Sequence, residues 1–314
     1  MTWSNKTKKR VRRRSKKNIE NVQRRKKYKS NKRKYLYRGG ANKGYGGVNC
    51  NIAIKDNVPG SCLTSEIIDS VKETYNSNHQ DTPIHETDRH EVLKKIMESK
   101  HCADERCVLE DKKDIIDQRY APEHPRSWLK NPDEWLTNED IDKFLDDVEQ
   151  KYSDFEALRT TPIDFDKRIW GQCVERELCE FSLKDKLNKG KKRFGAVFNL
   201  DKHDQPGSHW VSLFISVDDR AIIFFDSAYG GVPKEIKSFV KRIQDQAKSL
   251  NKILTFRTNK VEHQKSDTEC GMYSIYFITE MLKDFKNLET FMNGNISDNV
   301  VFKKRDEYFN DPLT

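Results

Sequence analysis

The middle of the chain alternates apolar and polar positions as β-strands do. Residues 209–217 place one alternating set on a single face: His209, Val211, Leu213, Ile215 and Val217. This period of two predicts a strand. Residues 220–226 and 194–200 are further short apolar segments, and Asp218-Asp219 is a plausible two-residue turn. The pattern therefore predicts an antiparallel hairpin made of residues 209–217 and 220–226.

Two helical patterns flank these strands. Residues 233–250 are amphipathic, with Pro233 near the first position, as is common at a helix start. Residues 270–282 are apolar nearly all round, which predicts a buried helix that begins at Cys270. The helix at 233–250 connects the strand at 220–226 to residues 253–256, and such a crossover favours parallel neighbours. We therefore predict an α+β fold, a mixed central sheet packed by helices.

The N-terminal half is more polar and mainly helical. We predict one helix that opens at residues 61–64 and another at 86–100, each with an apolar stripe. A third follows Thr137, which can cap it in a partial capping box with Asp140. The predicted division is a basic tail and glycine-rich hinge at 1–47, a helical accessory region at 48–130, and a domain at 131–314 that holds the candidate chemistry.

The predicted hairpin brings a histidine to a carboxylate. With a two-residue turn, Val217 pairs with Arg220 and Val211 pairs with Asp226, so His209 is the diagonal neighbour of Asp226. A carboxylate there can hold the imidazole tautomer and stabilise the imidazolium. A slip of one residue would move Asp226 to the other face, so this inference depends on the turn.

A thiol and an amide complete the set of groups that cysteine-dependent acyl transfer needs. Cys270 lies at a predicted helix N-terminus, which favours thiolate. Gly271 would let a substrate backbone pass close to the sulfur, and Gln264 could donate its amide N–H to an oxyanion. Each residue alone has a plain structural interpretation, as a core cysteine, a packed strand residue or a turn. Their combination in this order favours catalysis.

The same residues carry a family resemblance. The pattern resembles the SUMO-specific (ubiquitin-like-protein-specific) cysteine proteases, and it is similar to the maturation proteinases of adenoviruses and asfarviruses. The string from Phe194 to Trp210 looks most like the predicted thiol proteases of large DNA viruses. The three motifs that carry this resemblance over roughly residues 130–285 are His209-Trp210, Asp226-Ser227 and Gln264-x5-Cys270-Gly271.

The resemblance implies a role for each motif residue. His209 would be the general base, Asp226 its orienting partner, Cys270 the nucleophile, Gln264 the oxyanion donor, and Trp210 would flank the substrate channel. It also implies a papain-like-related protease core at 131–314, a protein substrate, and no cofactor or metal. The expected activity is a cysteine endopeptidase that cleaves after Gly-Gly-type sites and processes viral structural polyproteins. The alternatives are an isopeptidase acting on ubiquitin-like conjugates, an acyltransferase, and an inactive binding module of the same fold.

Charge is unevenly distributed along the chain. Residues 1–38 hold 18 Lys or Arg and one acidic residue, a net charge of +17; the whole chain is +9, so the rest carries −8. We expect this tail to be disordered in isolation and to bind nucleic acid through phosphates without sequence preference. A nuclear-localisation signal is the competing use. The residues we expect to contact nucleic acid are Arg12, Arg13, Arg14, Arg24, Arg25, Lys26 and Lys27.

Residues 38–47 predict a flexible glycine-rich hinge. The related viral proteinases favour cleavage after Gly-Gly, which suggests that the enzyme clips its own tail before Ala41 or Val48. The competing interpretation is a plain linker.

The seven cysteines are odd in number and lack a disulfide-framework spacing, so we expect free thiols in a reducing, intracellular setting. Cys102 and Cys107 form a single Cys-x4-Cys without a second pair, a weak basis for zinc. No apolar run is long enough to span a membrane, and no apolar secretory segment is present. We expect a monomer in the virion and host-cell cytoplasm, with the nucleus reachable through the basic tail.

Overall fold

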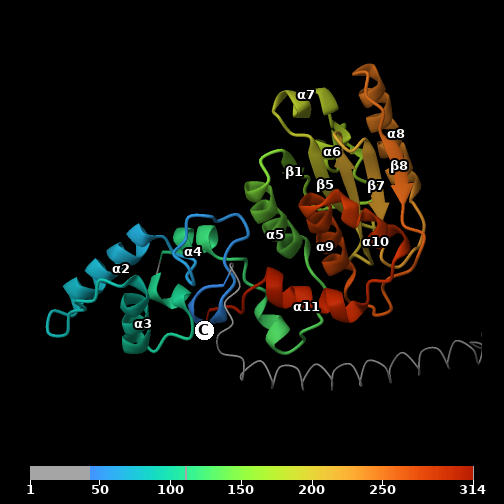
Figure 1. The fold of residues 1–314 in the computed structure, drawn as a ribbon. Helices are drawn as coiled ribbons and strands as arrows, with labels where there is room; N and C mark the ends of the chain where they lie inside the picture. The colour runs from blue at the N-terminus through green and yellow to red at the C-terminus, as the bar shows by residue number, and fades with distance from the viewer. Residues whose placement is uncertain (1–42, 110–111, 314) are drawn as a thin grey trace, which may run out of the picture.

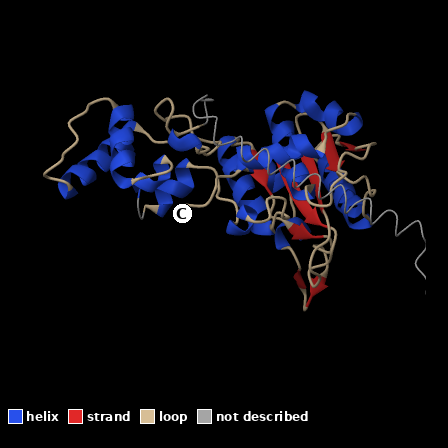
Figure 2. Ribbon diagram, turned by 90° about the horizontal axis from the view of Figure 1, so that it is seen from below, coloured by secondary structure: helices blue, strands red, loops and turns tan. Residues whose placement is uncertain are grey.

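The computed structural model describes residues 43–109 and 112–313, which form two lobes (Figure 1). The helical lobe comprises residues 43–120, and the sheet lobe comprises residues 121–313, in which helices lie on both sides of a β-sheet (Figure 2). The helical lobe has one hydrophobic cluster of its own, and the sheet lobe has one on each face of its sheet. The predicted nucleic-acid contacts of the basic tail and the predicted clipping before Ala41 fall on residues outside the described ranges.

A mixed sheet forms the centre of the sheet lobe, which confirms the predicted α+β fold. Its strand order is β1-β5-β6-β7-β8, with β2 also paired to β5. The neighbours β5, β6 and β7 are antiparallel, whereas β1, β2 and β8 run parallel to their partners. The strands are β1 (Phe155–Ala157), β2 (Thr161–Pro162), β5 (Arg193–Asn199), β6 (Trp210–Ser216), β7 (Ala221–Phe225) and β8 (Thr255–Thr258).

The hairpin register matches the prediction. Ser216 pairs with Ala221 and Ser212 pairs with Phe225, which is the register that a turn at Asp218-Asp219 fixes. The Arg220 N–H donates to the Val217 carbonyl at 3.3 Å. The predicted crossover is also confirmed, because β7 and β8 are parallel and α8 connects them.

Helices cover both faces of the sheet. One face packs against α5, α9, α10 and α11, and the other packs against α6, α7 and α8. The predicted capping box is present at the start of α5, where the Thr137 hydroxyl and the Asp140 carboxylate each accept from the other's backbone N–H. The helices of this lobe are α5 (Asn138–Lys151), α6 (Arg176–Cys179), α7 (Leu183–Asn188), α8 (Lys234–Ser249), α9 (Cys270–Lys283), α10 (Leu288–Asn293) and α11 (Asp298–Tyr308), with single 3-10 turns at Arg126–Leu129 and Phe285–Asn287.

The helical lobe contains α2 (Ser65–Asn78), α3 (Arg89–Lys100) and α4 (Lys113–Arg119), with 3-10 turns at Tyr45–Gly47 and Glu105–Leu109. Thr64 caps α2 by accepting from the Ile67 N–H, and Asp88 caps α3 in the same way. The lobe meets the sheet lobe through polar contacts: Asn49 and Asn310 exchange hydrogen bonds, and the Asn51 amide donates to Asp147 at 2.9 Å.

A small hairpin was not predicted from the sequence. Strands β3 (Arg168–Ile169) and β4 (Gln172–Cys173) are antiparallel and lie in a segment whose apolar periodicity is mixed. Trp170 and Gly171 form its tip with φ of 51° and 83°, and the Trp170 side chain is 99% exposed.

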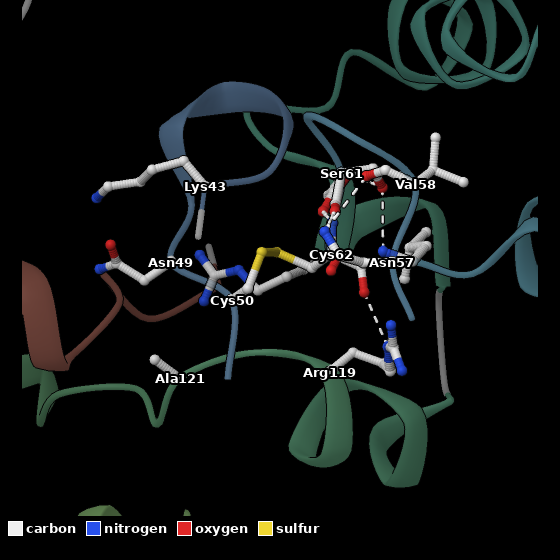
Figure 3. Close-up of a disulfide and its surroundings, with 12 residues drawn as sticks. Lys43, Asn49, Cys50, Asn57, Val58, Ser61, Cys62, Arg119 and Ala121 are labelled. Carbon is white, nitrogen blue, oxygen red and sulfur yellow. Dashed lines mark hydrogen bonds between the residues drawn. A yellow bond between two sulfur atoms is a disulfide. The ribbon is translucent and has the colours of Figure 1, made fainter. Parts of the chain in front are cut away.

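The expectation of free thiols is wrong for six of the seven cysteines. They pair as Cys50–Cys62, Cys102–Cys107 and Cys173–Cys179, with Cα–Cα distances of 5.2, 5.7 and 6.2 Å, a range that disulfides span without backbone movement. Figure 3 shows the Cys50–Cys62 bond, which joins two segments of the helical lobe that are 12 residues apart in sequence. Cys102 and Cys107 therefore bind each other rather than a zinc ion.

The glycine-rich hinge is partly ordered. Lys43 and Asn49 form an isolated antiparallel bridge, and the Gly44 N–H donates to the Val48 carbonyl at 2.9 Å. A side chain at Gly44 would clash with the buried carboxylate of Glu105. The predicted cleavage site between Gly47 and Val48 thus lies in a folded turn, and the Val48 side chain is buried. Over the part of the chain that the structure describes, no helix is long and apolar enough to cross a membrane.

Candidate active site

His209 and Asp226 meet at one end of the sheet, where β6 begins and β7 ends. The His209 Nε2 atom lies 2.7 Å from Asp226 Oδ1. The confirmed hairpin register is the local cause, since it places residue 209 diagonally across from residue 226. His209 is partly exposed and Asp226 is buried, so the imidazole can still be reached from solvent.

The Asp226 carboxylate is fixed by the loop that follows it. Oδ1 also accepts the Ala228 N–H at 2.9 Å, and Oδ2 accepts the Gly230 N–H at 2.6 Å. The Asn259 side chain binds both backbone groups of Asp226. Burial alone would raise the pKa of Asp226, but the hydrogen bond and charge of His209, with these two N–H donors, lower it below 3.8. Asp226 is therefore ionised at neutral pH.

Cys270 is the first residue of α9, as predicted, and it is buried and free of any disulfide. This thiol lies close enough to His209 to affect its pKa, and because Nε2 of His209 faces Asp226, Nδ1 is the atom left for Cys270. Burial lowers the pKa of His209, but hydrogen bonds to Asp226 and Cys270 and their charges outweigh it and raise the pKa to about 9. The imidazole thus holds a proton between a carboxylate and a thiol at the N-terminus of a helix, an arrangement that activates a nucleophile.

Gln264 is tied to the same loop through Ser227. Its side-chain oxygen accepts the Ser227 hydroxyl at 2.6 Å, its backbone N–H donates to the Ser227 carbonyl at 2.9 Å, and its Nε2 donates to the Ser266 carbonyl at 2.9 Å. One amide hydrogen remains for another acceptor. No role was predicted from the sequence for Ser227, which orients the candidate oxyanion donor.

Trp210 and Gly271 converge on Leu136. The Trp210 indole N–H donates to the Leu136 carbonyl at 3.0 Å, and the Trp210 ring is buried. A Cβ at Gly271 would lie 3.0 Å from Leu136 Cβ. The space that a side chain at Gly271 would enter is therefore filled by the protein's own Leu136. The passage of a substrate backbone beside Gly271 stays a prediction. Trp135, which sequence analysis did not propose for the site, is 38% exposed and donates to the Asp267 carbonyl at 2.8 Å.

Among residues 43–109 and 112–313, no three or more His, Cys, Asp or Glu side chains are grouped so that they could hold a metal ion. The site brings together a thiol, an imidazole, a carboxylate and an amide, the groups that cysteine-dependent acyl transfer uses.

The comparisons with known proteins agree with this geometry. Residues 181–312 match the Ulp1 protease family, C-terminal catalytic domain. A thiol protease of Acanthamoeba polyphaga mimivirus is 27% identical over 213 residues, which cover 64% of this chain and 66% of the relative. A cysteine protease of African swine fever virus is 32% identical over 119 residues, 37% of this chain and 43% of the relative. In other isolates that viral protein is named a SUMO-1 cysteine protease.

The fold is shared with a solved viral enzyme. The crystal structure of an African swine fever virus protease has a TM-score of 0.60 and 22% identity, and the match covers 84% of this chain and 96% of that one. It therefore extends beyond the family's catalytic domain into the N-terminal half. The aligned region spans less than two thirds of each of the two curated relatives. Residues 181–312 therefore form a domain that matches the C-terminal catalytic domain of the Ulp1 protease family.

Proposed function

We propose that this protein is a cysteine endopeptidase that cleaves after Gly-Gly-type sites in viral structural polyproteins. The single observation that carries the catalytic part is the contact of His209 with both Asp226 and Cys270 at one end of the sheet. The fold and family of the viral relatives support a viral protease.

The reaction follows from the positions of these groups. The Cys270 thiolate attacks the scissile carbonyl carbon, and the carbonyl oxygen becomes an oxyanion that the remaining Gln264 N–H and a backbone N–H stabilise. Protonated His209 gives its proton to the departing amine, which leaves a thioester on Cys270. His209 then removes a proton from water, which hydrolyses the thioester and restores the thiolate. Asp226 keeps the imidazole oriented throughout.

The preference for glycine is supported by aromatic bulk around the nucleophile. The buried Trp210 donates to the carbonyl of Leu136, which lies beside Gly271. The partly exposed Trp135 donates to the carbonyl of Asp267, three residues before Cys270. A substrate that approaches the thiol beside such rings fits best when its residues before the scissile bond lack side chains. Gly-Gly sequences meet that requirement.

A second candidate activity is cleavage of ubiquitin-like conjugates. It is favoured by the family match and by the SUMO-1 protease name of the African swine fever virus relative. Both activities use the same catalytic groups and the same Gly-Gly preference, so only the rest of the substrate distinguishes them.

The test is a cleavage assay with wild type beside Cys270→Ala on two panels, peptides with internal Gly-Gly-Xaa and precursors of SUMO- and ubiquitin-like proteins. We expect wild type to cut after the second glycine of the peptides and Cys270→Ala to be inactive. Cleavage of the folded precursors alone would favour the second candidate. Equal activity of the two proteins, or none with wild type on either panel, would contradict the proposal.

We further propose that the basic tail binds nucleic acid and that the protein acts in the virion. The support is the net charge of +17 in residues 1–38, which attracts phosphates with a steep dependence on salt. Binding to a duplex DNA of arbitrary sequence should fall linearly, on logarithmic axes, as salt rises. Glutamine in place of Arg12, Arg13 and Arg14 should reduce that slope; an unchanged slope would contradict the proposal.

A further inference from the structure

Helix α11, near the C-terminal end of the chain, contacts the segment that carries the catalytic amide and thiol. That segment, residues 264–270, runs from Gln264 to Cys270 without a regular element before α9 begins. Figure 1 shows α11 below α9, between the two lobes. Two contacts join α11 to the segment, one near each of its ends, and the second of them is buried.

The first contact is made by Asp298, the first residue of α11. Its carboxylate accepts the Lys265 N–H at 3.1 Å on each oxygen and the Ser266 N–H at 2.8 Å. It also accepts the Tyr273 hydroxyl of α9 at 3.1 Å. Because the Ser266 carbonyl in turn holds the amide of Gln264, Asp298 fixes the turn that orients the candidate oxyanion donor.

The second contact is made by Arg305, seven residues later. Its Nε donates to Glu269 Oε2 at 3.0 Å, with side-chain exposures of 3% and 0%. Glu269 directly precedes Cys270. The Arg305 guanidinium also stacks over the Trp128 ring, 4.3 Å from its centroid. A buried ion pair of this kind holds its two partners in one geometry, because separating them leaves a charge without its counterion.

Asp298 and Arg305 are spaced so that both contacts are made from one face of α11. Residues seven apart lie on the same face of a helix, about 10.5 Å apart along its axis. A rigid helix thus sets the separation between the turn that holds Gln264 and the residue before Cys270.

We propose that Asp298 and Arg305 are positioning residues, and that α11 sets the alignment of Gln264 and its amide hydrogen relative to the thiol of Cys270. This inference rests on the proposed function, because it concerns the same oxyanion site. A donor that binds only the developing oxyanion contributes to the transition state and not to the bound substrate. Misalignment should therefore lower kcat and leave KM nearly unchanged.

The experiment uses mild variants in the full-length protein, Asp298→Asn and Arg305→Lys, with Asp298→Ala and Arg305→Ala as their harsher counterparts. The matched control is Lys303→Ala, on an exposed part of the same helix. With a Gly-Gly-Xaa peptide, we expect kcat to fall about 10- to 100-fold for the alanine variants, with KM within about threefold of wild type. Arg305→Lys should recover part of the loss, and the control should match wild type.

Two measurements separate this inference from a loss of fold and from failure of the proposed function. Circular dichroism below each variant's melting temperature must show a folded protein, and only folded variants are compared. If wild type cleaves nothing, the proposed function fails, and the rate of Cys270 alkylation by iodoacetamide becomes the readout. We then expect a changed rate in Asp298→Ala and Arg305→Ala only. Unchanged kcat in the folded alanine variants, an equal loss in the control, or a rise in KM alone would overturn the inference, as would an unchanged alkylation rate.

Discussion

The two lobes use their polar residues in different ways. In the sheet lobe, apolar side chains on both faces of a sheet provide the core, and polar residues at one sheet end, such as His209 and Asp226, are arranged around a thiol. In the helical lobe the polar groups stabilise the lobe itself. Glu105 is fully buried and accepts the Ser61 hydroxyl and the Cys62 N–H, and Arg119 donates to the Cys62 carbonyl (Figure 3).

Size explains the difference. A small set of helices buries less apolar surface than a sheet covered on both faces, so it needs crosslinks and buried hydrogen bonds to stay folded. Two of the three disulfides lie in the helical lobe. We therefore predict that substitutions at the end of the sheet that carries His209 and Asp226 affect catalysis, whereas substitutions in the helical lobe affect stability.

The largest expected effect is on catalysis. Asp226→Asn should lower kcat/KM by about 10⁴-fold, because the amide can no longer hold the imidazole tautomer. The alkaline limb of the pH profile reports loss of the His209 proton, so it should lie near pH 9 in wild type and move to lower pH in the variant. Asp218→Asn, in the exposed hairpin turn, is the control and should leave both quantities unchanged. An unshifted limb in Asp226→Asn would contradict the assignment.

The next effect is on the stability of the helical lobe. Leu93 is completely buried there, and Leu93→Ala should cost about 2–5 kcal/mol through lost burial and a cavity. Chemical denaturation should show this loss, while the kcat for a short peptide stays near that of wild type. A comparable fall in kcat at a temperature where the variant is folded would show that the two lobes are coupled in catalysis.

A smaller loss is expected from removing one crosslink. Cys50 and Cys62 are 12 residues apart, and replacing both by alanine should lower the free energy of unfolding by about 2–3 kcal/mol. Reduction of the wild type by dithiothreitol should lower its melting temperature in the same direction, and the double variant should respond less. Equal responses of the two proteins would mean that this disulfide contributes nothing.

The smallest effect concerns the contact between the lobes. Burial raises the pKa of Asp147 to about 7, although the Asn51 amide that donates to it opposes the shift. A raised pKa means that stability is fully present below the unfolded value of 3.8 and is lost as pH rises through about 7. The melting temperature of wild type should therefore fall between pH 5 and 8 more steeply than that of Asp147→Asn. Parallel curves would refute this.

Much of the sheet end was predictable from sequence because local rules determine it. A two-residue turn fixes a hairpin register, which places His209 beside Asp226. An all-apolar segment predicts a buried helix, and α9 begins at Cys270 as predicted. The capping box at Thr137 is equally local, since both partners lie within four residues.

What the sequence did not reveal depends on contacts between distant segments. Cysteine pairing requires Cα atoms within about 7 Å of each other. The sequence separation of Cys50 and Cys62, 12 residues, does not show whether their Cα atoms come that close. Leu136 fills the space beside Gly271 although the two are far apart in sequence. Asp298 and Arg305 lie in a polar segment without strong periodicity, where no local signal marks a contact with residues 264–270.

The central claim is that Cys270, activated by His209, is the nucleophile for Gly-Gly substrates. Its most direct test is covalent capture with a peptide that ends in Gly-Gly and carries a vinyl methyl ester at the scissile position, followed by mass spectrometry of wild type and His209→Ala. We expect one adduct per wild-type chain, located on Cys270, and little or none in His209→Ala. No adduct in wild type, an adduct on another residue, or equal labelling of both proteins would contradict it.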